Sequence, residues 1–262
     1  MKSKLLRRIL SVSLAAAMMA GVGAVSANVA VSPGFSAWAV GVGENASFGD
    51  YTYYVTPYGE DSYAISIVKY NGTDTNVVIP SSMKVSFNQL AQTLPVVYID
   101  SKAFQDNTGL ETVVIPNSVV SVGSYAFAGC SALNDVTIPN SVRDMGEYCF
   151  SECNSLESVT IPNSMNYVPA HGFFKCENLK TVELPSTIKS INAWAFMYCS
   201  SLENIEFPEG LTGIGYFTFC GCTALESIDL PDSVTILGGS AFQQCTGAKT
   251  LKIGTGITKD RQ

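Results

Sequence analysis

The sequence predicts a mostly β protein, a solenoid of 23-residue coils closed at its N-terminal end by a β-hairpin cap. The segment VTIPNS occurs at residues 136–141 and again, 23 residues later, at residues 159–164. Hydrophobic and polar residues alternate before each of these prolines, as in a short strand with one buried face. A strand that recurs at a fixed interval is typical of repeat architectures.

Four columns of residues share this interval. The prolines are Pro116, Pro139, Pro162, Pro185, Pro208 and Pro231. The phenylalanines are Phe104, Phe127, Phe150, Phe173, Phe196, Phe219 and Phe242. The cysteines are Cys130, Cys153, Cys176, Cys199, Cys222 and Cys245, and the leucines are Leu110, Leu133, Leu156, Leu179, Leu202 and Leu225. Because four independent columns have one period, we predict a solenoid over residues 77–262.

Each column has a physical role in the coil. In one coil Leu110, Val113 and Ile115 are expected to point inward, while the residues between them point outward. The proline that follows ends the strand, because it has no N–H for the next rung. One coil cannot bury its own apolar face, so neighbouring coils must stack on it.

These columns identify a family resemblance. The pattern I-P-x-S-V-x-x-I-G-x-x-A-F-x-x-C is similar to the signature of the BspA-like leucine-rich repeat family, over about residues 99–257 and more loosely from Val77. The resemblance implies a bacterial leucine-rich-repeat solenoid. It also implies a role in adhesion to host matrix proteins or to other cells.

The N-terminal segment predicts secretion. Four basic residues are followed by an apolar run from Ile9 and by small residues up to Ala27, so we expect a signal peptide over residues 1–27. An uncleaved membrane anchor is the open alternative. Removing the segment takes the net charge from −7 to −11 and leaves no membrane span. We therefore expect a secreted, extracellular or cell-surface protein.

Four features are expected at the ends of the solenoid. Residues 28–47 are rich in Gly, Ala, Ser and Val and predict a linker, and residues 48–79 hold two Tyr-rich alternating runs that predict the β cap. An excursion is expected near residues 81–95, because Pro80 and Phe104 are 24 residues apart rather than 11. The last coil has little polar cap of its own, so end-on self-association is a hypothesis.

The cysteine column predicts a structural ladder of reduced thiols, with disulfides or a metal as open alternatives. No paired C-x-x-C spacing indicates zinc, so we expect no metal site. Cys220 lies outside the ladder and is the candidate for an exposed, reactive thiol. The single histidine, His171, and the nearby Cys149 form no nucleophile–base–orienter set. We therefore expect no catalytic residues, no cofactor and no enzymatic activity.

Two surfaces are candidate ligand sites. One, the aromatic stripe, precedes the Ala-Phe pair of successive coils and consists of Tyr125, Tyr148, His171, Trp194 and Phe217. The other, the acidic strand face, consists of Glu183, Glu203, Glu206, Glu226 and Asp229. The stripe either binds a ligand or seals the return side of the coil, and the acidic face either recruits a cationic partner or is a solvated surface.

The sequence therefore favours a secreted or cell-surface binding protein whose solenoid surface holds an extracellular protein or glycan. The acidic composition argues against nucleic acid, which prefers a basic stripe. A carbohydrate-binding accessory module that uses the aromatic stripe is one alternative. A structural module of a surface assembly is the other.

Overall fold

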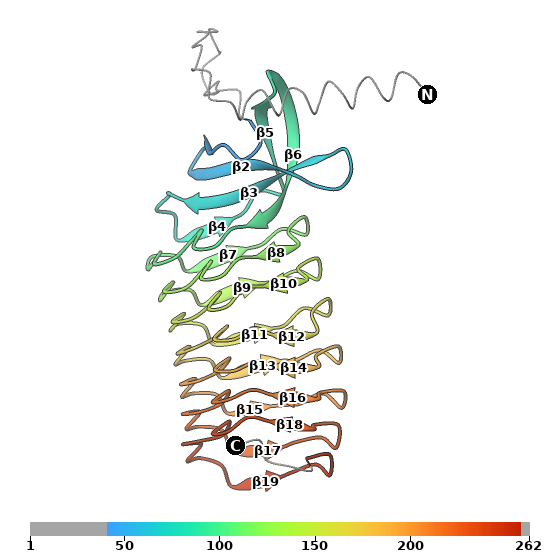
Figure 1. Ribbon diagram of the computed structural model, residues 1–262. Helices are drawn as coiled ribbons and strands as arrows, with labels where there is room; N and C mark the ends of the chain where they lie inside the picture. Colours follow the sequence, from blue (N-terminus) through green and yellow to red (C-terminus); the bar gives the residue numbers. More distant parts are fainter. Residues whose placement is uncertain (1–40, 258–262) are drawn as a thin grey trace, which may run out of the picture. The chain divides into compact units, whose positions relative to one another are not determined.

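The computed structural model describes residues 41–257, which belong to a single unit, Trp38–Gln262. Within this range the chain forms strands and turns, and no described residue is helical. The coils stack one on another below an N-terminal cap (Figure 1). The mostly β, leucine-rich-repeat solenoid predicted from the sequence is thereby confirmed.

The cap is a mixed sheet that merges with the solenoid. Its strands are β1 (Ala46–Phe48), β2 (Tyr51–Pro57), β3 (Tyr63–Tyr70), β5 (Ser82–Phe87) and β6 (Leu90–Ile99). β1, β2 and β3 pair antiparallel in sequence order, and β3 then pairs parallel with β6. β6 also pairs antiparallel with β5 and parallel with β8, the first return strand of the solenoid. One ten-residue strand thus joins the cap to the coils.

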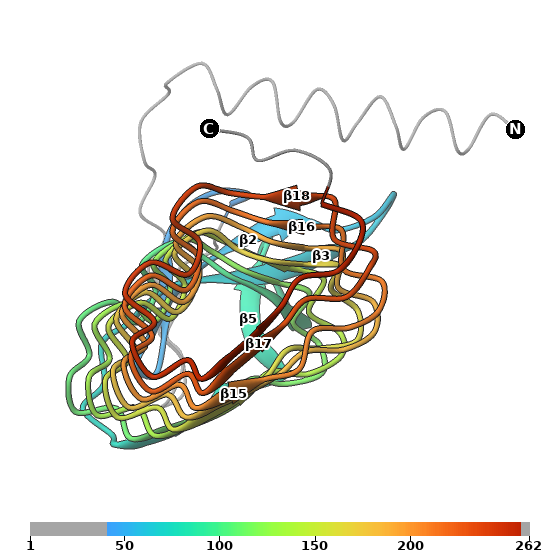
Figure 2. The same cartoon turned by 90° about the horizontal axis from the view of Figure 1, so that it is seen from below.

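Each coil contributes one strand to each of two faces. The strand face holds β4 (Asn76–Val78), β7 (Thr112–Val114), β9 (Asp135–Thr137), β11 (Ser158–Thr160), β13 (Thr181–Glu183), β15 (Asn204–Ile205), β17 (Ser227–Asp229) and β19 (Thr250–Lys252). The return face holds β8 (Ser121–Val122), β10 (Asp144–Met145), β12 (Tyr167–Val168), β14 (Ser190–Ile191), β16 (Gly213–Ile214) and β18 (Ile236–Leu237). The pairs within each face are parallel, with partners 23 residues apart from β7 onward. Figure 2 shows the coils nearly superimposed along the solenoid axis.

The core contains a continuous phenylalanine spine. Ring centroids of successive spine residues lie 4.8 to 5.7 Å apart and the rings are stacked. Tyr70 of the cap stacks on Phe104 at 5.2 Å and so extends the spine into the cap. Phe104 to Phe219 are fully buried, whereas Phe242 is only partly covered. The leucines of the repeat surround this spine and are also buried.

The structure adds detail at the N-terminal end. The expected excursion is the hairpin of β5 and β6, whose turn residues Asn88 and Gln89 both have positive φ. β1 begins at Ala46, and Val42 forms an isolated bridge with Val55, so the end of the segment 28–47 that was predicted to be a linker belongs to the cap. The predicted signal peptide lies outside the described residues. Within residues 41–257, no helix is long and apolar enough to cross a membrane.

Candidate functional site

The backbone presents the aromatic stripe from one repeated turn. Each stripe residue follows a return strand and has a positive φ, between 54° at Phe217 and 59° at Tyr125 and Tyr148. This left-handed conformation costs a non-glycine residue about 1–2 kcal/mol. Hydrogen bonds to the next coil hold it in place, such as those from the Tyr125 N–H to the Glu147 carbonyl (2.9 Å) and from the Trp194 N–H to the Tyr216 carbonyl (2.9 Å). The turn therefore fixes where each side chain leaves the coil.

The rings of the stripe stack on one another along the solenoid. Centroid separations are 4.6 Å from Tyr125 to Tyr148, 4.0 Å from Tyr148 to His171, and 4.8 Å from His171 to Trp194. The last step, from Trp194 to Phe217, is 6.3 Å. Interplanar angles are 12° or less throughout. Neighbouring rings thus cover one another's faces and leave edges toward solvent.

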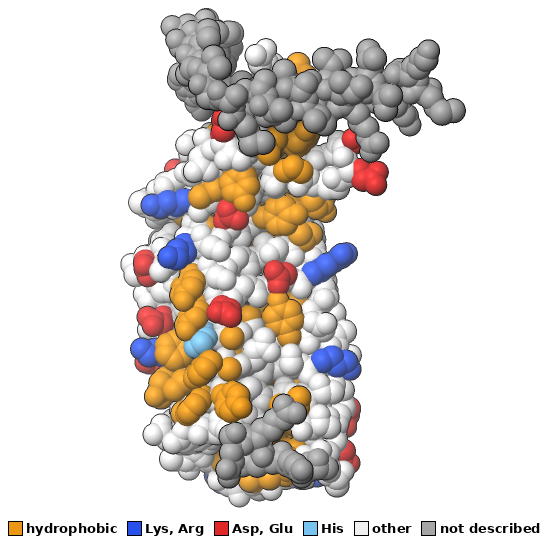
Figure 3. All heavy atoms as spheres, viewed as in Figure 1, with side chains coloured by type: hydrophobic (Ala, Val, Ile, Leu, Met, Phe, Trp, Pro, Cys, Tyr) orange, Lys and Arg blue, Asp and Glu red, His pale blue; other side chains and the backbone are white. Residues whose placement is uncertain are grey.

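Further aromatic side chains widen the stripe at its centre. Phe174 meets the rings of Tyr148, His171 and Tyr198 edge-on, at 6.5, 5.9 and 6.2 Å. Tyr198 is 40% exposed, and the stripe residues themselves are half-buried. Figure 3 shows hydrophobic side chains gathered around the single histidine on this side of the molecule. The stripe therefore forms part of the molecular surface.

Cations flank this surface. The Lys102 ammonium lies 5.8 Å from the Tyr125 ring centroid, at the N-terminal end of the stripe. The Lys175 ammonium lies 5.3 Å from the Phe174 ring and 3.9 Å from Glu152. The Tyr125 and Tyr148 hydroxyls and the Trp194 Nε1 have no hydrogen-bond partner within residues 41–257. The stripe thus combines apolar edges with unpaired polar tips.

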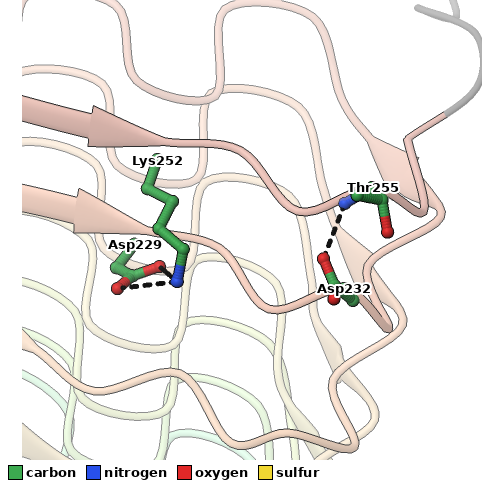
Figure 4. A network of polar contacts seen from close by, with 4 residues as sticks. All are labelled: Asp229, Asp232, Lys252 and Thr255. Carbon is green, nitrogen blue, oxygen red and sulfur yellow. Dashed lines mark hydrogen bonds and ion pairs between the residues drawn. The ribbon is translucent and has the colours of Figure 1, made fainter.

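The acidic strand face is partly neutralised by its own lysines. Glu226 pairs with Lys249 of the next coil at 2.9 Å. Asp229 likewise pairs with Lys252 at 3.1 Å (Figure 4). Glu183 accepts a hydrogen bond from the Thr160 hydroxyl at 2.9 Å. Only two of the five carboxylates, those of Glu203 and Glu206, lack such a partner among the described residues. Across residues 41–257, no three His, Cys, Asp or Glu side chains are grouped to hold a metal ion.

A neighbouring polar contact follows the same coil-to-coil rule. The Asp232 carboxylate accepts a hydrogen bond from the Thr255 backbone N–H at 2.8 Å, close to the Asp229–Lys252 pair (Figure 4). This bond lowers the pKa of Asp232 from its ordinary value. The carboxylates of Asp229 and Asp232 thus both interact with the next coil of the solenoid.

The cysteine ladder faces the interior. Each ladder thiol donates to the carbonyl oxygen of the phenylalanine 26 residues earlier, at 3.1 to 3.3 Å. All eight cysteines are free thiols. Burial raises the pKa of Cys130 and of Cys176 to about 12, so these thiols stay protonated at neutral pH. The ladder satisfies backbone carbonyls inside the turns.

One expectation about the cysteines is wrong. Cys220 was expected to be exposed and reactive, but its side chain is only 3% exposed. It lies in the same turn as Phe219, on a chain segment that packs against the next coil, and burial raises its pKa. Cys149 is fully buried as well, and its pKa is raised by the same cause. A thiolate nucleophile is not favoured at either position.

Sequence reasoning named the stripe but missed the left-handed turn that presents it. The glycines Gly129 and Gly221, four residues after stripe positions, have φ of 73° and 79° and are a sequence signal of left-handed backbone in this turn.

Comparison with known proteins gives the same architecture. The family model "BspA type Leucine rich repeat region", with six copies, matches residues 97–203 and 168–261. The crystal structure of a T. pallidum leucine-rich repeat protein is 30% identical, with a TM-score of 0.68 over 78% of this chain and 91% of that one. A leucine rich cell surface protein from Faecalibacterium prausnitzii is 22% identical, with a TM-score of 0.53 over 82% and 78% of the two chains. No curated protein sequence matches the chain.

The family match covers more than half of the chain, and its repeats coincide with the coils that the structure shows. The protein belongs to the BspA-type leucine-rich repeat family.

Proposed function

We propose that this protein is a non-enzymatic binding protein of the bacterial cell surface or extracellular space, and that its aromatic stripe holds a protein partner. The surface assignment is supported by the family and by the similar F. prausnitzii protein, which is described as a cell surface protein. Adhesion to host matrix or to other cells is the role that fits such a surface. Because one fold serves many functions, the kind of partner is inferred from the side chains of the stripe and not from the fold.

The observation that carries this proposal is the half-buried cluster of rings with unpaired polar tips. Tyr and Trp are enriched at the energetic centres of protein interfaces, where the ring is buried and the polar tip finds a partner. Tyr148 and Trp194 have this arrangement, with ring faces packed on His171 and tips free. Five stacked rings are held by the turn before any partner arrives, so little side-chain entropy is lost on binding.

The arrangement favours a protein partner over a glycan. A sugar ring binds by stacking on an aromatic face, and the inner faces of the stripe are covered by neighbouring rings at 4.0 to 4.8 Å. Ring edges and polar tips suit peptide groups and side chains instead.

The test is a binding assay of the full chain against immobilised extracellular matrix proteins and polysaccharides, at low and high salt. The Trp194→Ala variant should lose at least about tenfold in affinity for a matrix protein, as for an interface centre. The matched control is Glu206→Gln on the acidic strand face. Glu206 has no partner among residues 41–257, and the variant should bind as the unchanged protein does.

Two results would overturn the proposal. Binding that fades with salt and is lost in Glu206→Gln, but kept in Trp194→Ala, would move the site to the acidic strand face. Polysaccharide binding that survives high salt and is lost in Trp194→Ala would make the protein a carbohydrate-binding module.

A further inference from the structure

His171 lies at the centre of the aromatic stripe, between two other rings. Its imidazole stacks on Tyr148 at 4.0 Å and on Trp194 at 4.8 Å, and the edge of Phe174 closes a third side at 5.9 Å. The Nδ1 atom is buried and has no hydrogen-bond partner. An unpaired acceptor is tolerated in such a place better than an unpaired N–H, so the neutral ring keeps its proton on Nε2.

The surroundings of this ring oppose a positive charge. Burial lowers the pKa of His171 from its ordinary value, and Glu147 on the preceding coil acts weakly in the opposite direction. Lys175 lies over the Phe174 ring and pairs with Glu152 at 3.9 Å. Lys102 lies over the Tyr125 ring, on the far side of Tyr148 from His171. The remaining neighbours, Tyr148, Trp194 and Phe174, are uncharged rings at neutral pH.

We propose that His171 makes the aromatic stripe sensitive to pH: the neutral ring keeps the stack continuous, and protonation drives the ring out of the stack and interrupts the apolar surface. A protonated imidazole has an N–H at both nitrogens. The proton on Nδ1 would point into a site without an acceptor, and this costs free energy that the cation regains by turning toward water.

The consequence for binding rests on the proposed function of the stripe. A partner that covers the stripe removes His171 further from water and therefore binds the neutral form better. By linkage, each unit by which binding lowers the pKa of His171 gives about a tenfold weaker affinity at acidic pH. Acidification should therefore release the partner.

The first experiment needs no partner. His171 is the only histidine, so its ring proton resonances in an NMR titration of the full chain are unambiguous. A Trp38→Phe background leaves Trp194 as the only tryptophan, and its fluorescence reports on the stack. We expect a His171 midpoint below about 6.5, the ordinary value, and a change in Trp194 emission with the same midpoint.

Two variants test the assignment. His171→Phe should keep the stack, because Phe217 has the same turn position and a φ of 54°, and it should abolish the change in Trp194 emission. Glu147→Gln removes the charge that favours the cation and should move the midpoint to lower pH. A midpoint at or above about 6.5, or Trp194 emission that is unchanged through the titration, would overturn the proposal.

The second experiment uses the matrix protein that is retained in the Trp194-dependent assay. Its affinity should fall at least several-fold between about pH 7.5 and 5.5 for the unchanged chain, and stay constant for His171→Phe. Loss of affinity that persists in His171→Phe would contradict the role of this residue in release. If no partner binds the stripe, the proposed function fails, while the titration still decides whether the stripe responds to pH.

Discussion

The phenylalanine spine and the aromatic stripe are two columns of stacked rings with the same 23-residue period. They differ in burial and in the range of residue types that each column contains. Every coil supplies phenylalanine to the spine, and six of its seven rings are fully buried. The stripe holds two tyrosines, a histidine, a tryptophan and a phenylalanine, and the same column holds Lys102 before them and Ser240 after them. The stripe residues have positive φ, whereas none of the spine phenylalanines does.

This difference separates stability from function. A spine position is enclosed by the coils above and below, so close packing permits one ring size there. A stripe position is held by its backbone hydrogen bonds to the next coil, and the side chain is half exposed. The residue type at a stripe position can therefore change without loss of the fold. Binding residues are commonly found at such positions, on turns that a rigid scaffold holds in place.

The largest expected effect is in the spine. Phe173→Ala should lower the free energy of unfolding by about 3–5 kcal/mol, because it leaves a cavity between two stacked rings. Urea denaturation followed by circular dichroism measures it. The matched control is Phe174→Ala in the same coil, at a half-buried position, which should cost clearly less. Equal losses in the two variants would mean that the spine is not the main source of stability.

The sequence predicted the inside of this molecule better than its outside. A spine phenylalanine such as Phe127, a ladder cysteine such as Cys153 and a repeat leucine such as Leu156 are interior residues, and their period reveals them because each coil imposes the same packing. The merging of the cap with the coils through β6 was not predicted, because it depends on pairing with three different strands. Spacing alone gives no such long-range pairing.

The candidate site was predicted only as a column. The exposure of the stripe depends on the direction in which its side chains leave a left-handed turn. Because the residues at these positions are not glycine, the sequence does not indicate a positive φ there. Cys220 shows the same limit, because its repeat column also holds Ser151, Phe174 and Gln243, so no constant residue type at this position predicts that the cysteine is buried.

A smaller effect, of opposite sign, should appear in the turn itself. Gln244 is exposed, has a φ of 61°, and occupies the column in which Gly129 and Gly221 occur. Gln244→Gly should therefore raise the free energy of unfolding by about 0.5–1 kcal/mol, because it relieves the left-handed strain. The control, Gln243→Gly, changes a neighbour without positive φ and should be neutral or slightly destabilising. Thermal unfolding measures the stability of both variants. Destabilisation by Gln244→Gly would contradict the presence of left-handed strain in the turn.

The smallest effect is expected on the acidic strand face. Glu226 and Lys249 form a 2.9 Å ion pair, but both side chains are more than half exposed, at 57% and 70%. Glu226→Gln should change the free energy of unfolding by less than about 1 kcal/mol, because solvent screens the pair and holding two long side chains costs entropy. The control Glu206→Gln breaks no pair in the part of the chain that the structure describes and should be neutral. Any difference between these variants should shrink as salt is raised, since screening weakens the attraction. A salt-independent loss of several kcal/mol in Glu226→Gln would show that the coil-to-coil ion pairs, and not the buried ladders alone, hold the stack together.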